Sequence, residues 1–455
     1  MRHRDGATRG GPGFVSTSWL PYAQPPTFAR MTFEPTPTFA THLDAQDPLR
    51  DFRNRFLIPP APNGGESLYL CGNSLGLQPR AVRAALDQEL NTWAELAVDG
   101  HFDGPSPWMH YHETLAETEA LVVGAKPVEV VVMNNLTTNL HLLLTSFYRP
   151  TPTRYKVLME GGAFPSDQYA LETQTKLHGF EPDDAIVELT PRPGEHTLRT
   201  EDIEAKIAEL GDSLATIIMG GINYYTGQVF DMQAITRAGH AVGAMVGFDL
   251  AHAAGNVELH LHDWDVDFAC WCTYKYMNSG PGSVGGAFVH ERFADRPDLL
   301  RLAGWWGHDA DERFKMKKGF KPMAGAAGWQ LANGNVLTLA AHRAALALFA
   351  EVGGMEPLRR KSEQLTAYLE FLIKRLELPA SRLEIITPTD PAARGCQLSL
   401  LVHQGGRELF DHLTEAGVVG DWREPNVIRL APVPFYNSFA DVQRVGEVLT
   451  AWAGQ

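Results

Sequence analysis

One stretch of the sequence places a carboxylate and a lysine at a spacing that has a chemical use. Asp249 follows a short apolar run, residues 244–248, and Lys275 follows a second apolar run, residues 266–272, that alternates like a strand. A glycine-rich segment, residues 280–286, comes shortly after the lysine. A lysine can form a Schiff base with pyridoxal phosphate, and a carboxylate can keep the pyridine nitrogen protonated so that the ring accepts electrons. The pattern therefore predicts a pyridoxal-phosphate site.

The simpler alternative is a solvated surface lysine and an aspartate that caps a helix. Lys275 is flanked by Tyr274 and Tyr276 and comes straight after an apolar strand. Charged residues rarely enter apolar surroundings without a partner, so this setting favours the cofactor site. Asp249 at the end of the preceding strand is the expected partner of the cofactor ring.

The glycine segment also matches GxGxxG, the dinucleotide-binding pattern. That pattern requires a strand before it and a helix after it. Here the glycines follow the lysine and lead into residues 287–289, which look like another strand. A dinucleotide site is therefore rejected.

Two further strand ends are expected to bring polar groups to the same place. Residues 128–133 read as a strand, and Leu136 and Thr137 begin the helix that follows. Free backbone N–H groups and the helix dipole make such a terminus an anion site, although an ordinary helix cap would look the same. Pro165 opens a second helix at a strand end. This turn adds candidate cofactor contacts: Phe164 as a stacking ring, with Pro165, Ser166 and Asp167.

The fold class follows from the alternation of strands and helices between about residues 128 and 250. This order predicts an α/β protein with a mostly parallel sheet sandwiched by helices. Ligands bind such sheets outside the carboxyl ends of the strands, where the candidate residues fall. The expected organisation is an irregular extension (1–40), an arm joining the small domain (41–78), a large cofactor-binding domain (79–328) and a smaller C-terminal α+β domain (329–455).

The central segment resembles the kynureninases, pyridoxal-phosphate enzymes of fold type I that are similar to class V aminotransferases. The matching strings are GFDLAHAAGNVELHLHDWDVDFACWCTYKY at 247–276, GWWGH at 304–308 and APVPFYNSF at 431–439. The resemblance extends from about Leu70 to the C-terminus. It implies hydrolytic Cβ–Cγ cleavage of L-kynurenine, 3-hydroxy-L-kynurenine or both, giving alanine plus anthranilate or 3-hydroxyanthranilate, in tryptophan degradation and NAD biosynthesis.

The resemblance also implies roles for individual residues. Lys275 would hold the cofactor and remove the α-proton, Asp249 would keep the ring nitrogen protonated, and His252 would support Asp249 or the ring oxygen. Tyr274 would contact the phosphate and donate a proton, for which a phenol needs a cationic or phosphate neighbour to exchange protons near neutrality. Arg429 is the candidate for the substrate α-carboxylate, because a guanidinium binds it through two parallel hydrogen bonds.

Three more residues match family positions near the ligands. Trp305 and Asn333 would contact the cofactor, and His101 and Asn333 the substrate, partly across the interface of a homodimer. His101 with Asn333 follows the animal-type pattern, which suggests tolerance of 3-hydroxykynurenine without settling the preference. One position departs from the family: Gly220 replaces a serine that contacts the phosphate in some members, so it is left out of the candidate site.

The composition of the whole chain limits its partners and its location. A net charge of −15 over 455 residues argues against a nucleic-acid partner. Four cysteines without a CxxC pair suit a reducing cytoplasmic setting, and no metal site is expected. No apolar run is long enough for a membrane helix, and the arginines near the N-terminus lack the apolar region of a secretory signal. Either Met1 or Met31 could be the natural start.

Two other functions stay open on the sequence. A cysteine desulfurase or selenocysteine lyase of the same fold would need a nucleophilic cysteine on a mobile loop, and Cys396 lies in the right region. Cys396, however, heads an apolar run and reads as a strand residue. A non-catalytic protein that binds the cofactor is the other alternative, although Lys275, Asp249 and Tyr274 are all present.

Overall fold

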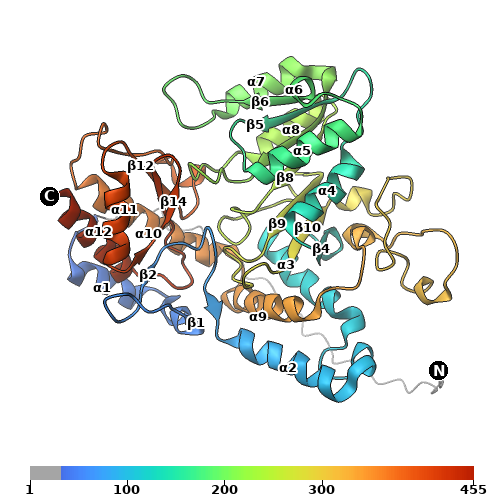
Figure 1. Ribbon diagram of the computed structural model, residues 1–455, viewed down its shortest axis with the longest axis horizontal. Helices are drawn as coiled ribbons and strands as arrows, with labels where there is room; N and C mark the ends of the chain where they lie inside the picture. The colour runs from blue at the N-terminus through green and yellow to red at the C-terminus, as the bar shows by residue number, and fades with distance from the viewer. Residues whose placement is uncertain (1–31, 455) are drawn as a thin grey trace, which may run out of the picture.

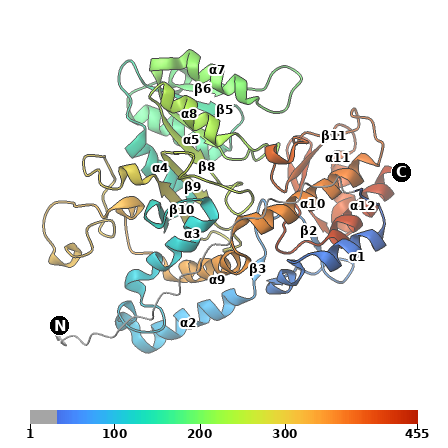
Figure 2. The same cartoon turned by 180° about the vertical axis from the view of Figure 1, so that it is seen from behind.

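The computed structural model describes residues 32–454, which form two lobes (Figures 1 and 2). Most of the irregular extension expected over residues 1–40 lies outside this range. The expected end of this extension, at residue 40, needs a correction. Helix α1 (Pro37–Gln46) already begins at Pro37, where the Thr36 hydroxyl caps the Phe39 N–H and proline occupies the first helical position. Residues 37–40 are therefore helical.

The larger lobe is built on a sheet of seven strands within the described residues, in the order β4-β10-β9-β8-β7-β5-β6. Strand β10 is antiparallel to both of its neighbours, and the other strand pairs are parallel. The mostly parallel α/β sheet predicted from the sequence is thus confirmed. The strands are β4 (Val130–Met133), β5 (Lys156–Glu160), β6 (Ile186–Leu189), β7 (Leu214–Gly220), β8 (Met245–Asp249), β9 (Phe268–Cys272) and β10 (Gly285–Val289).

Helices cover both faces of this sheet, because alternate residues of each strand point to opposite sides. Val131 and Met133 pack with α4 and α5, whereas Val130 and Val132 belong to the core that includes α3, α7, α8 and α9. The helices of this lobe are α2 (Ala81–Leu96), α3 (Ala116–Val123), α4 (Leu136–Phe147), α5 (Pro165–Leu177), α6 (Pro182–Ala185), α7 (Thr200–Leu210), α8 (Met232–Ala241) and α9 (Val336–Val352).

The smaller lobe has its own core around a four-stranded antiparallel sheet, ordered β11-β12-β15-β14 in the described chain. Segments of the N-terminal arm join it, since α1 packs on α12 and β2 (Leu68–Tyr69) pairs with β13 (Val418–Val419). Its other elements are α10 (Met355–Lys374), β11 (Leu383–Ile385), β12 (Leu398–Val402), α11 (Gly406–Glu415), β14 (Asp421–Arg423), β15 (Val427–Leu430) and α12 (Phe439–Ala453). A two-stranded sheet of β1 (Phe56–Leu57) and β3 (Gln78–Pro79) precedes α2.

The boundary expected between residues 328 and 329 needs a correction. Helix α9 does not open the smaller lobe: its apolar residues, among them Leu339 and Leu346, belong to the core of the large sheet, and it lies along α2 (Figure 1). After α9, the chain joins the core of the smaller lobe on α10, at Leu365. No single helix in residues 32–454 is long and apolar enough to cross a bilayer; α9 and α10 pass that test only together, across an 84° bend.

Candidate active site

A pocket lies at the carboxyl ends of β5, β7 and β8 and beside the loop after β9. Parallel strands bring their carboxyl ends to one edge of the sheet, which is why residues far apart in sequence meet there. The structure brings together nine of the residues named from the sequence: Leu136, Thr137, Phe164, Ser166, Asp167, Asp249, His252, Tyr274 and Lys275. Pro165 is the first residue of α5, between two of them.

Each side of the pocket has a local structural cause. Asp249 is the last residue of β8, and its carboxylate is held in place by the Ala251 N–H, 2.7 Å from Oδ1. Helix α4 begins at Leu136, where the Asn135 side chain caps the Thr138 N–H. The N–H groups of the first helical turn have no acceptor within the helix, so this end of the pocket suits an anion.

Lys275 lies over the pocket in contact with a neutral imidazole. Its Nζ is 3.1 Å from His252 Nε2 and 5.9 Å from the centres of the Phe164 and Tyr274 rings. Burial, together with the charge of Lys275, holds the pKa of His252 well below its usual range. The imidazole therefore accepts a hydrogen bond from the lysine, and its buried Nδ1 has no partner among the described residues.

Three carboxyl groups line the pocket, and sequence reasoning named only two of them. Burial, together with the charge of the neighbouring Asp249, raises the pKa of Asp167 well above its usual range. Burial also raises the pKa of Asp249. The third is Glu160, the last residue of β5, whose pKa burial raises to about 7. A glutamate directly after the apolar run VLM, residues 157–159, is the signal that could have identified it.

Gly220, set aside on the sequence, also lines the pocket and is tied to Glu160. Its N–H lies 3.1 and 3.2 Å from the two Glu160 carboxylate oxygens. A Cβ at this position would lie 2.9 Å from Glu160 Oε1, which is closer than real Cβ contacts. The absence of a side chain therefore lets the backbone approach the buried glutamate.

The role expected of Tyr274 requires a cationic or phosphate neighbour, and Lys275 Nζ lies 5.9 Å from the centre of the Tyr274 ring. Burial, and next the neighbouring Cys272, raises the pKa of Tyr274 above its ordinary value. The phenol therefore stays protonated in this chain. The Tyr274 hydroxyl can therefore donate a proton, but only to a group that is basic enough to accept it.

Arg429 does not line the pocket. It is fully buried and pairs with Asp421, with its Nη2 2.7 Å from Oδ2 and its Nε 3.1 Å from Oδ1. Its Nη1 donates to the carbonyl of Tyr224 at 2.7 Å, and the Tyr224 residue does line the pocket. Arg429 therefore lies behind Tyr224, which lines the pocket, and its guanidinium is already paired with the Asp421 carboxylate.

The remaining three predicted residues lie elsewhere on the single chain. Trp305 is 46% exposed and donates to the carbonyl of Arg313. Asn333 lines a separate hollow near the start of α9. The His101 ring stands edge-on against Trp108, with ring centres 5.3 Å apart. None of the three meets the nine pocket residues within one copy of the chain.

Cys396 lacks the features of a nucleophilic cysteine. Its side chain is fully buried, and its backbone N–H donates to Asn256 Oδ1 at 3.0 Å. Burial raises the pKa of the thiol to about 12. A thiolate nucleophile needs the opposite shift and access to substrate.

Comparison with known proteins identifies the family. Residues 358–449 match the model of the kynureninase C-terminal domain. The chain is 56% identical over 416 residues to a kynureninase of Koribacter versatilis, covering 91% of this chain and 97% of that protein. It is 55% identical over 420 residues to a kynureninase of Flavobacterium psychrophilum, covering 92% and 98%.

Solved structures add the fold. A cysteine desulfurase from Thermococcus onnurineus superposes with a TM-score of 0.71 at 17% identity, covering 89% of this chain and 98% of that one. A C-DES variant with glycine covalently linked to its pyridoxal-phosphate cofactor gives 0.70 at 16%, covering 87% and 98%. At this identity the likeness shows the fold alone. Together, these matches show that the chain belongs to the kynureninase family and has the fold of the type I pyridoxal-phosphate enzymes.

Proposed function

We propose that the protein hydrolyses the Cβ–Cγ bond of L-kynurenine or 3-hydroxy-L-kynurenine, releasing L-alanine and anthranilate or its 3-hydroxy derivative. The observation that carries the proposal is the meeting of Lys275, Asp249 and His252 with two helix N-termini in one pocket. Family membership supports the choice of reaction. We also place the enzyme in the cytoplasm, in tryptophan degradation and NAD biosynthesis; all four cysteines lie in the described residues and are free and buried, which suits that compartment.

The residues of the pocket fit pyridoxal phosphate. Asp249 is buried, and its carboxylate is oriented by the Ala251 N–H. Asp167 Oδ1 is buried without a hydrogen-bond partner among the described residues, so a polar group of a ligand is expected beside it. Leu136 and Thr137 at the start of α4 would bind the phosphate, and the half-exposed Phe164 ring would cover the cofactor ring. When bound, the cofactor supplies an electron sink for negative charge at the α-carbon of the substrate.

Proton transfers fall to the side chains around that carbon. Lys275 Nζ would hold the cofactor and then take the α-proton, with the neutral His252 imidazole 3.1 Å away to accept a hydrogen bond from it. Water adds to the γ-carbonyl and forms the new C–O bond as the carbonyl π bond opens. Loss of an O–H proton from this adduct to solvent then re-forms the carbonyl as the Cβ–Cγ bond breaks and its electron pair passes to Cβ. Tyr274, kept protonated by its raised pKa, would give the proton that completes alanine.

Arg429 would bind the substrate α-carboxylate. Its guanidinium is oriented by Asp421 and by the Tyr224 carbonyl, and it is fully buried, so it is held rigidly behind the pocket. A planar guanidinium presents five N–H donors, so it can hold Asp421 and still offer one edge to a second carboxylate. A shift of the Tyr224 segment is required to expose that edge.

A homodimer would complete the site, since Trp305, Asn333 and His101 lie outside the pocket of their own chain. An apolar groove runs over residues of β1, α2 and α9, including Leu57, Leu86 and Leu337. On α2, Trp93 is 62% exposed. Exposed apolar surface of this kind marks an interaction site.

The dimer has a direct test. Trp93→Glu is expected to shift the protein to monomers in light scattering and to lower activity, whereas Leu177→Glu, at an exposed leucine on α5, is expected to leave both unchanged. Mixing Lys275→Ala with Trp305→Ala chains is expected to restore activity above either variant alone if the tryptophan acts across the interface. A fully active Trp93→Glu monomer would contradict the shared site.

The function itself is tested by supplying the cofactor-loaded protein with L-kynurenine, 3-hydroxy-L-kynurenine and L-cysteine separately. Anthranilate-type product and alanine are expected in equal amounts from at least one kynurenine, and the ratio of rates gives the preference. Lys275→Ala should abolish product, while Lys176→Ala, at an exposed lysine on α5, should not. Sulfide from cysteine without aromatic product would instead support a desulfurase, and no product from a cofactor-loaded protein would support a non-catalytic role.

A further inference from the structure

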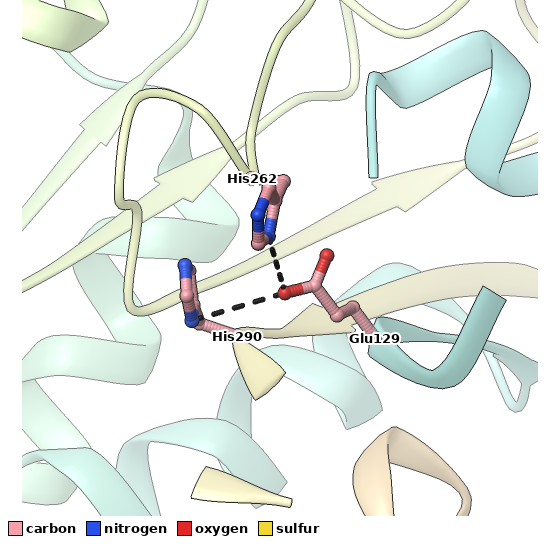
Figure 3. A group of neighbouring side chains, drawn as sticks. All are labelled: Glu129, His262 and His290. Carbon is pink, nitrogen blue, oxygen red and sulfur yellow. Dashed lines mark hydrogen bonds and ion pairs between the residues drawn. The ribbon is translucent and has the colours of Figure 1, made fainter. Parts of the chain in front are cut away.

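A second group of chemically capable side chains lies at the opposite edge of the large sheet. Glu129 immediately precedes β4, His290 immediately follows β10, and His262 comes from the loop between β8 and β9 (Figure 3). Since β10 is antiparallel to β4, the end of β10 meets the start of β4. The cofactor pocket lies at the other ends of these strands, so the two sites are separate.

The three side chains converge on a small volume. One ligand atom from each, a Glu129 carboxylate oxygen and one ring nitrogen of each histidine, lie within 4.8 Å of one another. Glu129 Oε1 is 2.9 Å from His262 Nδ1 and 3.8 Å from His290 Nδ1. The two imidazole rings are stacked, with centres 5.0 Å apart and planes 19° apart. Zinc bonds of about 2.0–2.1 Å at tetrahedral angles require ligand atoms about 3.3 Å apart, so the ligand atoms must approach by up to about 1.5 Å and the stacked rings must turn to aim their lone pairs at one ion.

His290 Nδ1 is an acceptor nitrogen, and its lone pair now receives the Arg292 N–H, a bond that an ion would have to displace. Because Nδ1 accepts from the Arg292 N–H at 3.2 Å, the proton of the neutral ring lies on Nε2, which is 3.3 Å from Asp265 Oδ1. His290 Nδ1 and Glu129 Oε1, both of which are hydrogen-bond acceptors, therefore lie 3.8 Å apart. A carboxylate on the far nitrogen of a ligating histidine is the usual outer shell of a metal site.

Glu129 is anchored independently of the histidines. Its Oε2 accepts from the Lys126 N–H and its Oε1 from the Glu291 N–H, each at 2.8 Å, and the side chain is fully buried. These backbone bonds would remain if an ion replaced the His262 proton that now bridges Nδ1 and Oε1. The carboxylate is thus already oriented as a ligand would be.

We propose that Glu129, His262 and His290 bind a divalent transition-metal ion, with Zn²⁺ as the preferred class, outside the catalytic site. Two imidazole nitrogens and one carboxylate oxygen suit zinc and leave a fourth position for water. The charged groups around the site are already paired: Lys126 with Glu291, Arg292 with Asp265 and Asp267, and His240 with Asp267. Binding requires His262 to carry its proton on Nε2, because Nδ1 must present its lone pair to the ion.

The test uses the full-length protein with its cofactor, stripped of metal by a chelator and dialysed against Zn²⁺. About one zinc ion per chain is expected in the wild type, and His262→Gln and His290→Gln should bind at least tenfold more weakly. Glutamine keeps a hydrogen-bond donor for Glu129, so folding is preserved. The matched control is His260→Gln, at an exposed histidine two residues from His262, which should retain zinc. Asp265→Asn should weaken binding about 10–100-fold by removing the outer carboxylate.

Two readouts decide the proposal without relying on activity. X-ray absorption of the zinc-loaded wild type should show two imidazole ligands with oxygen ligands, and Co²⁺ in place of Zn²⁺ should give the strong visible bands of four-coordination. Equal zinc in the wild type and in both glutamine variants would overturn the proposal, as would a wild type that binds none. Because the readouts are metal content and spectra, failure here is distinct from failure of the proposed hydrolysis.

Discussion

Replacing Glu160 with glutamine tests whether the pocket holds a buried carboxyl group that is neutral over part of the physiological range. Burial raises the pKa of Glu160 from 4.5 to about 7 in the folded chain. Between these values the unfolded chain has lost the proton and the folded chain has kept it. The folded state therefore binds more protons in this window, and the free energy of unfolding falls as the pH rises.

The size of the effect follows from the two pKa values. The difference of about 2.5 pKa units corresponds to about 3 kcal/mol, at about 1.4 kcal/mol for each unit. Glutamine at position 160 cannot ionise, yet it keeps an oxygen to accept the Gly220 N–H. The free energy of unfolding of Glu160→Gln, relative to that of the wild type, should therefore rise by about 3 kcal/mol between pH 4.5 and 7. Below pH 4.5 this difference should stay constant, because Glu160 is then protonated in both the folded and the unfolded wild type.

The assay is urea denaturation of the cofactor-free protein at fixed chain concentration across this pH range, because assembly would otherwise shift the apparent stability. Glu188→Gln, at an exposed position on the neighbouring strand β6, is the matched control and should track the wild type. A difference between wild type and Glu160→Gln that stays constant from pH 4.5 to 7 would refute the reasoning. A difference that changes in the opposite direction would refute it as well.

Two other substitutions probe the surroundings of the site. Asp421→Ala leaves the fully buried Arg429 without its carboxylate, so the free energy of unfolding should fall by about 3–5 kcal/mol, against less than about 1 kcal/mol for the exposed Asp411→Ala. Urea denaturation measures both, and equal losses would contradict a buried ion pair. Gly220→Ala places a Cβ 2.9 Å from Glu160 Oε1, so the substitution should lower the free energy of unfolding by about 1–3 kcal/mol and lower the melting temperature. An unchanged melting temperature would show that the Glu160 side chain moves aside without cost, and would contradict the prediction.

The centre of the site could be predicted because its signals are local. Asp249 ends one apolar run and Lys275 follows the next, and each apolar run of this kind becomes a buried strand with its carboxyl end at the same edge. The start of α4 was predictable for a similar reason, since asparagine before an apolar periodic run caps a helix. The sheet class follows from the same alternation.

Other features depend on contacts between distant segments, which periodicity does not record. The buried pair of Arg429 and Asp421 joins neighbouring strands, and the reach of Arg429 to the Tyr224 carbonyl links residues 205 positions apart. The packing of α9 on the large lobe is likewise set by its contact with α2 rather than by its own pattern. Trp305, although identified from the resemblance, is not placed at the pocket by its own chain.

The most direct test of the account follows the oxygen atom of the water that is consumed. The cofactor-loaded protein would be given L-kynurenine in ¹⁸O-labelled water, and anthranilate and alanine would be analysed by mass spectrometry. Hydrolytic Cβ–Cγ cleavage predicts labelled oxygen in the anthranilate carboxylate, equal amounts of alanine, and loss of both products in Lys275→Ala. Anthranilate without the label, or undiminished product from Lys275→Ala, would contradict the proposed chemistry and its assignment to this pocket.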